Sequence, residues 1–312
     1  HVNSLGQLDL QFCDGKELVD SVFSVLSFNR LQGTSFNSVR DVIQKTDPDI
    51  VALQESYDIG VKIADYFNYC FIGEDDYSVA VLSKYPVEII NNMQYKIMLN
   101  NVDYIHFFNI HLSPYPYQPY DIRDNLITTP QQAIHQSEQA RGLDVTHLIS
   151  LIDDINDDMP IIVAGDFNEP SHLDWITHAE NPSRFHNNQL GNFVVDWPAS
   201  NKMINMGLVD AYRDFLSNPI SKPGYTWTPN YSVDEVHDRI DFIYYKNNIS
   251  LESVLLVGPD DLSDIILHDY ESDHRAILAK FQFNILTQLC QFCGSNMCCS
   301  AINTTSCCCY PN

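Results

Sequence analysis

Basic residues are scarce in this chain, which has 17 lysine and arginine residues against 41 aspartate and glutamate residues, a formal net charge of −24. Proteins that grip duplex nucleic acid neutralise its phosphates with a basic surface, so this balance argues against duplex nucleic acid as a partner. Long apolar runs are also missing. None approaches the ~18 residues that a membrane-spanning helix needs, and we therefore expect no membrane span.

Cysteine is nearly absent from the body of the chain, where only Cys13 and Cys70 occur, whereas the other seven crowd residues 290–309. Such a dense tail is typical of an oxidising compartment, and the odd total of 9 predicts an intermolecular bridge or a free thiol. A soft-metal site is the alternative, because Cys290 and Cys293 have ligand spacing. No regular set of partner ligands follows, so we favour disulfides, with a disulfide-linked oligomer as one consequence.

The chain begins with His1 rather than methionine, as a processed mature chain does. Three Asn-x-Ser/Thr sequons, at Asn230, Asn248 and Asn303, are candidate N-glycosylation sites. Together with the cysteine tail, these features predict a secreted, extracellular protein.

Branched apolar residues at 161–164 predict a buried strand, which Gly165 and Asp166 end abruptly and Asn168 follows. Open α/β sheets bind their ligands beyond the carboxyl ends of such strands. Further strands are expected at 21–28, 50–55, 78–83, 104–112, 236–245 and 276–281, with a hairpin at 87–99 and a strand with a turn at 224–229. Helices are expected at 35–45 and 131–155, and a long loop region with short helices at 171–205.

Polar residues stand at the ends of six of these segments. Two histidines, several carboxylates and two amides suit hydrolysis assisted by a hard divalent ion, for which Mg²⁺ fits better than Zn²⁺ and Mn²⁺ or Ca²⁺ are alternatives. The set is Asn29, Glu55, His111, Asp166, Asn168, Arg239, Asp241, Asp273 and His274.

The segment 113–120 alternates prolines with tyrosines, including Tyr115 and Tyr117. Prolines stiffen the backbone and tyrosines present flat rings, so the segment could form a rigid wall that stacks on a substrate ring. A packed surface loop is the alternative explanation.

The segments Ser27-Phe28-Asn29, Asp49 to Glu55, Asn109-Ile110-His111, Gly165 to Asn168, Asp238 to Asp241 and Ser272-Asp273-His274 resemble the endonuclease/exonuclease/phosphatase superfamily, which includes deoxyribonuclease I. They occur in the family's order. The resemblance implies a four-layer α/β sandwich in which two central mixed β-sheets are flanked by helices. It implies a catalytic domain over residues 1–283, and residues 284–312 form a cysteine-rich tail outside it.

The resemblance also implies roles for individual residues. Glu55 would hold one divalent ion, with Asn29 and Asp273 nearby. Asp166 would orient and deprotonate the attacking water, and His111 and Asn168 would bind phosphoryl oxygens. Asp241 would hold His274, which would stabilise the transition state or assist proton transfer. Arg239 would support this network or reach a phosphate.

The fold hosts several activities, so the substrate must be argued separately. Glu169-Pro170 stands where inositol-polyphosphate phosphatases usually carry an arginine. We predict a secreted, metal-dependent phosphoester hydrolase that acts on a small or exposed phosphodiester. The alternatives are an extracellular endonuclease acting on DNA or RNA, and a structural or adhesive protein that is cross-linked through its tail.

Overall fold

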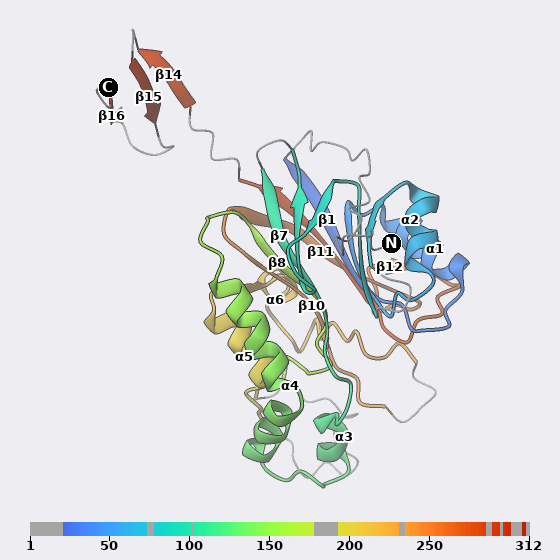
Figure 1. Cartoon of the computed structure of the whole chain (residues 1–312). Helices are drawn as coiled ribbons and strands as arrows, with labels where there is room; N and C mark the ends of the chain where they lie inside the picture. Colours follow the sequence, from blue (N-terminus) through green and yellow to red (C-terminus); the bar gives the residue numbers. More distant parts are fainter. Residues whose placement is uncertain are drawn as a thin grey trace, which may run out of the picture.

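The computed structural model describes residues 21–73, 78–100, 103–177, 193–230 and 235–284, together with the backbone of three short strands between 289 and 309. Two β-sheets lie face to face in the centre of the molecule, and helices cover their outer faces (Figure 1). The predicted fold class, a four-layer α/β sandwich, is confirmed.

The larger sheet is mixed, because β1 pairs parallel with β2 and antiparallel with β13. Its seven strands, in spatial order, are β12 (Ile265–Ile266), β11 (Ile249–Gly258), β13 (Ala276–Phe283), β1 (Val22–Asn29), β2 (Ile50–Gln54), β4 (Val79–Ser83) and β3 (Cys70–Ile72).

The smaller sheet is also mixed, because β7 pairs parallel with β8 and β8 pairs antiparallel with β10. Its six strands, in spatial order, are β5 (Val87–Ile89), β6 (Gln94–Met98), β7 (Tyr104–His111), β8 (Ile161–Asp166), β10 (Asp241–Lys246) and β9 (Val209–Asp210).

Helices connect the parallel strands and cover the sheets. The longest begins at a capping box, in which Thr129 and Gln132 satisfy each other's backbone N–H groups, and it joins β7 to β8 as a βαβ unit. The described helices are α1 (Phe36–Thr46), α2 (Gly60–Phe67), α3 (Gln118–Arg123), α4 (Pro130–Asp153), α5 (Pro198–Asn205) and α6 (Ala211–Phe215). No helix among the described residues is both long and apolar enough to cross a bilayer.

Alternation along the strands produces the layers. Val25 packs between the two sheets, whereas its neighbour Leu26 packs under α1 with Val39. In the second sheet Ile162 faces the first sheet, and Val163 faces α4. Strands that are apolar on both faces therefore account for the continuous runs in the sequence.

Most of the predicted elements are present with bounds shifted by one or two residues. The strand expected at 236–245 is wrong in its first half, because β10 begins only at Asp241. The backbone N–H groups of Ile240 and Asp241 bond instead to the Thr226 hydroxyl. The segment expected as a strand at 224–229 contributes only isolated bridges from Trp227. Helix α2 and the long strand β11 were not predicted.

The tail contains a small antiparallel sheet of its own, in the order β14 (Leu289–Cys293), β15 (Asn296–Ser300) and β16 (Cys308–Cys309). Among the described strands, these three pair only with one another. The domain boundary at residue 283 stays a prediction. Cys13, Asn303 and the side chains of the tail lie outside the described residues.

Candidate active site

Six strands bring polar side chains to one end of the paired sheets. Strands β1, β7 and β8 end there, and β2 is followed there by a carboxylate. Strands β10 and β13 start there, because they run antiparallel to β8 and β1. The residues delivered are Asn29, Glu55, His111, Asp166, Asp241 and His274.

Strand register places three of these residues side by side. His111 on β7 and Asp241 on β10 both lie opposite Asp166 on β8. The residue before Asp166 must be glycine for two reasons. Gly165 has φ +145°, and a Cβ added to it would lie 1.9 Å from the Ile110 carbonyl oxygen. Gly165, which was expected to end the strand, lies within β8 and allows β7 and β8 to approach closely beside the site.

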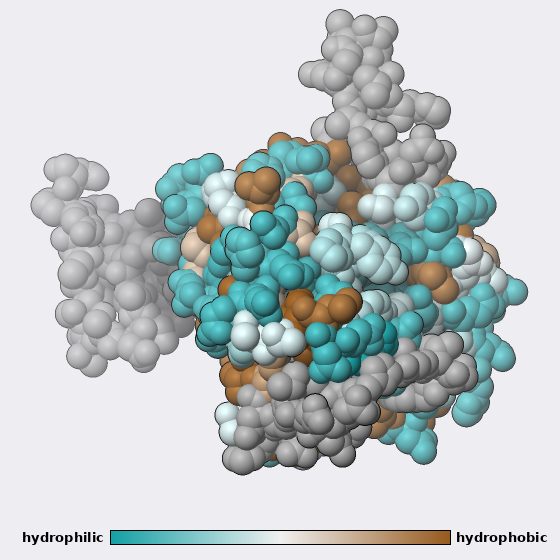
Figure 2. Space-filling model, turned by 90° about the horizontal axis from the view of Figure 1, so that it is seen from below, coloured by the Kyte–Doolittle hydropathy of each residue, from teal (hydrophilic) through white to brown (hydrophobic). Residues whose placement is uncertain are grey.

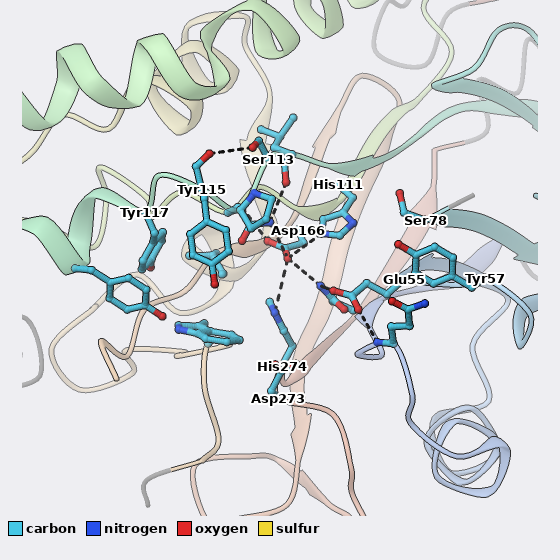
Figure 3. Close-up of a pocket in the computed structure, with 18 residues that line it drawn as sticks. Glu55, Tyr57, Ser78, His111, Ser113, Tyr115, Tyr117, Asp166, Asp273 and His274 are labelled. Atoms are coloured by element: carbon cyan, nitrogen blue, oxygen red, sulfur yellow. Dashed lines mark hydrogen bonds and ion pairs between the residues drawn. The ribbon is translucent and has the colours of Figure 1, made fainter. Parts of the chain in front are cut away.

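Asp166 is the centre of the site and is almost completely buried. Its Oδ2 accepts a hydrogen bond from Asn29 Nδ2 at 2.9 Å, and its Oδ1 accepts one from the Asn168 backbone N–H at 2.8 Å. The Nε2 atoms of His111 and His274 each lie 3.7 Å from Asp166 Oδ2, so two imidazoles approach one carboxylate (Figure 3). Burial, reinforced by the nearby Asp241 carboxylate, raises the pKa of Asp166.

His274 is held by Asp241, whose Oδ2 lies 2.9 Å from its Nδ1. This bond turns the Nε2 of His274 toward Asp166. Burial alone would lower the pKa of His274, but the carboxylates of Asp241 and Asp166 raise it to about 10. His274 is therefore an imidazolium at neutral pH, next to a carboxylate that gains proton affinity.

Glu55 and Asp273 supply the oxygen ligands that a hard divalent ion prefers. Both line the same cavity as Asp166. Burial raises the pKa of Asp273, against the pull of His274, and the Glu55 carboxylate adds to the rise. Among the described residues, no lysine or arginine forms an ion pair with either carboxylate. Two carboxylates that share a cavity without a basic partner can be neutralised by a bound cation. The residues present therefore suit the predicted metal.

Asn29 was predicted to stand near the metal, and the structure places it between the two acidic groups. Its Nδ2 donates to Asp166 and lies 3.5 Å from Glu55 Oε1. Its Oδ1 accepts a hydrogen bond from the Leu31 backbone N–H. The carboxamide thus serves mainly to orient Asp166, with one oxygen lone pair left for an ion.

A second group could hold a metal, because ligand atoms of Asp166, Asp241 and His274 lie within 4.8 Å of one another. The atoms of this group are already committed to one another and to Asn29, whose Nδ2 donates to Asp166 Oδ2. The His274 Nδ1 is also engaged by Asp241. Glu55 and Asp273 therefore suit a hard divalent ion better than this group does.

The turn that presents Glu55 is braced from inside. Glu55 has φ 54°, a left-handed conformation that is costly for a residue with a side chain. The buried Arg30 donates from Nε to the Glu55 carbonyl at 2.6 Å and from Nη2 to the Ser56 carbonyl at 3.1 Å. Asn168, at φ 49°, is left-handed too, and its Nδ2 donates to the Leu112 carbonyl at 2.9 Å and to Asp166 at 3.2 Å.

These residues surround a cavity of about 540 Å³. Tyr115 and Tyr117 lie on one side of Asp166, and Glu55 and Tyr57 lie on the other (Figure 3). Among the described residues, no lysine or arginine lines the cavity. The full lining is Asn29, Gln32, Glu55, Tyr57, Ser78, His111, Leu112, Ser113, Pro114, Tyr115, Tyr117, Tyr120, Asp166, Asn168, Trp227, Ile240, Asp273 and His274.

Arg239 is the one predicted site residue that the structure places elsewhere. It is buried and does not line the cavity. Its Nε donates to Asp174 Oδ2 at 2.9 Å, and its Nη1 donates to Asp210 Oδ1 at 3.0 Å. Burial alone would lower its pKa, but these two carboxylates raise it. The predicted phosphate contact has no support in this arrangement, because Arg239 lies before β10 rather than on its cavity face.

Trp227 lines the cavity and was not predicted to do so. The Trp227 ring lies 5.0 Å from the His274 ring and covers the imidazolium. Tyr120 belongs to the proline-tyrosine segment that had already been singled out. Trp227 comes from a segment without a strand-end signal, which is why the pattern of polar strand ends did not include it.

Comparisons with known proteins agree with this geometry. The sequence pattern of the Endonuclease/Exonuclease/phosphatase family matches residues 23–274. The "Uncharacterized protein F14F9.5" of Caenorhabditis elegans is 30% identical over 270 residues, which are 77% of this chain and 83% of that protein.

Two solved structures have similar folds. The endonuclease/exonuclease/phosphatase from Beutenbergia cavernae gives a TM-score of 0.52 at 14% identity, over 84% of this chain and 72% of that chain. TDP2 from Caenorhabditis elegans gives a TM-score of 0.52 at 18% identity, over 84% of this chain and 75% of that chain. At such low identity the likeness concerns the fold alone. The family pattern, however, spans most of the sequence and every residue of the cavity, and the chain therefore belongs to the endonuclease/exonuclease/phosphatase family.

Proposed function

We propose that this family member hydrolyses a phosphodiester, using a divalent metal ion and in-line attack of water on phosphorus. One observation carries the proposal. A buried carboxylate with a raised pKa, Asp166, lies between His111 and a charged His274 in a cavity that also contains Glu55 and Asp273. Metal-assisted hydrolysis of a phosphoester uses this combination of a base, a cation and a metal site.

In this proposal Asp166 is the general base and His274 is the cation that stabilises the phosphoryl group. Asp166 accepts a proton from the attacking water, because its raised pKa makes it a better base than a surface aspartate. The Asn29 carboxamide and the Asn168 backbone N–H hold its two oxygens in place. His274 offers its positive charge to the phosphoryl oxygens, and Asp241 fixes its orientation.

His111 and Asn168 complete the binding of the phosphoryl group in this proposal. The His111 Nε2 faces the same oxygen of Asp166 as His274 does, so a phosphoryl group between the imidazoles can contact both. The Asn168 carboxamide N–H groups already have partners in Asp166 and Leu112, so its predicted phosphoryl contact requires one of them to be exchanged.

Glu55 and Asp273 would hold the metal, and their oxygen donors favour Mg²⁺ over zinc. A bound ion at this position supplies positive charge for the phosphoryl oxygens and lowers the pKa of a nearby water. Mn²⁺ and Ca²⁺ share the preference for oxygen ligands.

The substrate we favour is a small phosphodiester with one negative charge. A polyanion would need several lysine or arginine side chains, and the described lining of the cavity contains neither. An extracellular endonuclease is the second candidate.

We also propose that the protein works outside the cell. Cys70 is disulfide-bonded, and the sequon residue Asn230 is exposed. The Asn248 amide donates to the Asp158 carbonyl, so a glycan there has to tolerate this bond. A cross-linked oligomer through the cysteine tail belongs to the same proposal, and it would run as a larger species on a non-reducing gel than on a reducing gel.

Four reactions test the proposed activity: bis(4-nitrophenyl) phosphate, 4-nitrophenyl phosphate, supercoiled plasmid, and a mixture without substrate, each with Mg²⁺ or with a chelator. We expect chelator-sensitive hydrolysis of the diester above that of the monoester, and little nicking. Efficient nicking would support the endonuclease instead. A folded, metal-loaded protein that is silent throughout would contradict both and favour the scaffold role.

A further inference from the structure

We propose that the aromatic side of the cavity binds a positively charged substituent of the diester, of the quaternary or protonated ammonium class. This inference rests on the proposed phosphodiesterase function and names its substrate class. It concerns four rings that line the cavity, which we call the aromatic wall: Tyr115, Tyr117, Tyr120 and Trp227.

The aromatic wall lies beside the place of the phosphoryl group, so one of the two ester substituents on phosphorus would contact it. The phosphoryl group belongs between His111 and His274, next to Asp166. Figure 3 shows Tyr115 and Tyr117 on the opposite side of Asp166 from Glu55. The metal side and the aromatic side of the cavity are thus distinct, so a substituent that points away from Glu55 meets rings.

Two carboxylates make the wall electron-rich. The Tyr117 hydroxyl donates to Asp238 Oδ2 at 3.2 Å, and the Tyr120 hydroxyl donates to Glu235 Oε2 at 2.5 Å. A phenol that donates to a carboxylate has a more negative ring face, and such faces attract cations. Burial lowers the pKa of the nearby His237, so this histidine adds no positive charge at neutral pH.

Two cations already lie against this wall, the His274 imidazolium beside Trp227 and the Arg123 guanidinium beside Tyr120, so a ligand cation has to use the rings of Tyr115 and Tyr117. The guanidinium carbon of Arg123 lies 5.0 Å from the centre of the Tyr120 ring. Arg123 itself does not line the cavity. The Tyr115 side chain is 70% exposed, so a ligand can still reach its ring.

The wall is also preformed. Buried Arg141 donates from Nη1 to the carbonyls of Ser113 and Pro116, at 3.0 and 3.2 Å, and so fixes the segment that carries Tyr115. Its Nε donates to Glu169, just after the catalytic turn. A ligand therefore does not have to order this loop, and more of the contact energy appears as affinity.

A cation fits this wall better than an anion or a neutral ring. The carboxylates behind the tyrosines repel a second phosphate, and the described lining offers no lysine or arginine to hold one. A neutral ring would stack, but it would gain nothing from the charge. Cation–π contacts on partly exposed rings give discrimination of about tenfold between a cation and its uncharged isostere.

Two esters test the inference directly. 4-Nitrophenyl phosphorylcholine carries a trimethylammonium group, and 4-nitrophenyl 3,3-dimethylbutyl phosphate replaces its nitrogen with carbon. Both release the same nitrophenolate, so they differ only in charge at the wall. We expect kcat/KM to be about tenfold higher for the choline ester. Equal kcat/KM values would overturn the inference and leave the phosphodiesterase proposal intact.

Variants then locate the effect. Tyr115→Leu should bring the ratio of the two kcat/KM values close to one, and Tyr115→Phe should keep it, because the ring remains. Tyr66→Leu is the matched control, since Tyr66 is an exposed tyrosine on α2 outside the cavity, and it should keep the wild-type ratio. A preference that survives Tyr115→Leu would assign the selectivity elsewhere and contradict the wall.

A binding measurement separates the two proposals if neither ester is hydrolysed. Titration of choline and of 3,3-dimethylbutanol into the whole protein, followed by calorimetry, needs no turnover. Preferential binding of choline would support the wall even though the proposed activity had failed. Equal or absent binding would reject the wall as well.

Discussion

Asp241 is fully buried, and its influence on the reaction passes through His274. Its Oδ2 bonds to His274 Nδ1, and its charge raises the pKa of both His274 and Asp166. One carboxylate therefore keeps the histidine charged and makes its neighbour more basic. These effects need the negative charge as well as the shape of the side chain.

Asp241→Asn tests this role. The amide keeps the shape but removes the charge, and it favours the wrong imidazole tautomer. We expect kcat to fall by roughly 10³- to 10⁴-fold with little change in KM. Steady-state kinetics on the diester give both values. Asp214→Asn is the control, because Asp214 is an exposed carboxylate that accepts a bond from Tyr245. A kcat for Asp241→Asn that matches this control would remove Asp241 from the site.

Glu55→Gln tests the metal site. Replacement of a charged oxygen ligand by a neutral one weakens binding of a hard ion, so the Mg²⁺ concentration for half-maximal activity should rise at least about tenfold. Glu252→Gln is the control, because it changes a carboxylate that pairs with Lys280, and it should leave the Mg²⁺ titration unchanged. Superimposable Mg²⁺ titrations for Glu55→Gln and the wild type would show that Glu55 is not a ligand.

His172 provides a test of pH dependence away from the metal. Burial lowers its pKa, against the pull of Asp196 and Asp174, and its Nδ1 lies 2.8 Å from Ser200 Oγ. As the pH falls, His172 is therefore protonated at a higher pH in the unfolded chain than in the folded protein. Its contribution to stability is present above the unfolded pKa of about 6.5 and is lost as the pH falls below it.

His172→Gln should accordingly reduce the drop in Tm between about pH 7.5 and about pH 5.5. Thermal unfolding at a series of pH values measures the slope. His135→Gln, which removes an exposed histidine of α4, should leave the wild-type slope unchanged. If the two variants have the same pH profile, the buried histidine is not the cause.

At the scale of the elements, the β7–β8 pair sets the spacing of the site. Its parallel register aligns His111 with Asp166, and Gly165 allows the Ile110 carbonyl to approach. Gly165→Ala should lower the free energy of unfolding by roughly 3 kcal/mol, because both the clash and the positive φ oppose it.

Gly33→Ala is the control for backbone strain alone. Gly33 has φ +102°, yet a Cβ there would meet nothing within 4 Å, so we expect a loss of about 1 kcal/mol. Urea unfolding of both variants gives the comparison. Equal losses would mean that the close approach to Ile110 contributes nothing.

The elements that could be predicted are those with a continuous apolar run or a long helical period. Strand β8 is buried on both faces and has a continuous apolar run. Helix α4 is buried on one face and has apolar residues at helical spacing. The start of β10 could not be predicted. A side-chain hydroxyl, that of Thr226, takes up the backbone N–H groups at that point, and local sequence does not reveal such a distant partner.

The same division applies to the site. Asn29, His111 and Asp166 stand at strand ends, so their meeting followed from topology. Arg239 was misjudged because a charged residue near a strand end can serve the core, here through Asp174 and Asp210, as well as a ligand. Trp227 approaches His274 from a loop, and no periodic pattern indicates that approach.

At the scale of the whole molecule, the chain is strongly acidic, and so is the cavity. The net charge is −24, and the face seen in Figure 2 is mostly hydrophilic, with hydrophobic residues in small patches. The cavity continues this trend, since it has carboxylates but, in the described part of the chain, no lysine or arginine. Under the proposed function, positive charge for the phosphoryl group would come from His274 and a metal, and a small diester needs less of it than a long polyanion does.

The role of Asp166 is tested most directly by kcat/KM for bis(4-nitrophenyl) phosphate, in Mg²⁺, for the wild type and for Asp166→Asn. Every other role assigned to the cavity converges on this carboxylate. We expect a loss of roughly 10³-fold or more in a variant whose thermal unfolding stays cooperative. Turnover of Asp166→Asn at the wild-type rate would contradict the account, because the reaction would then proceed without its proposed base.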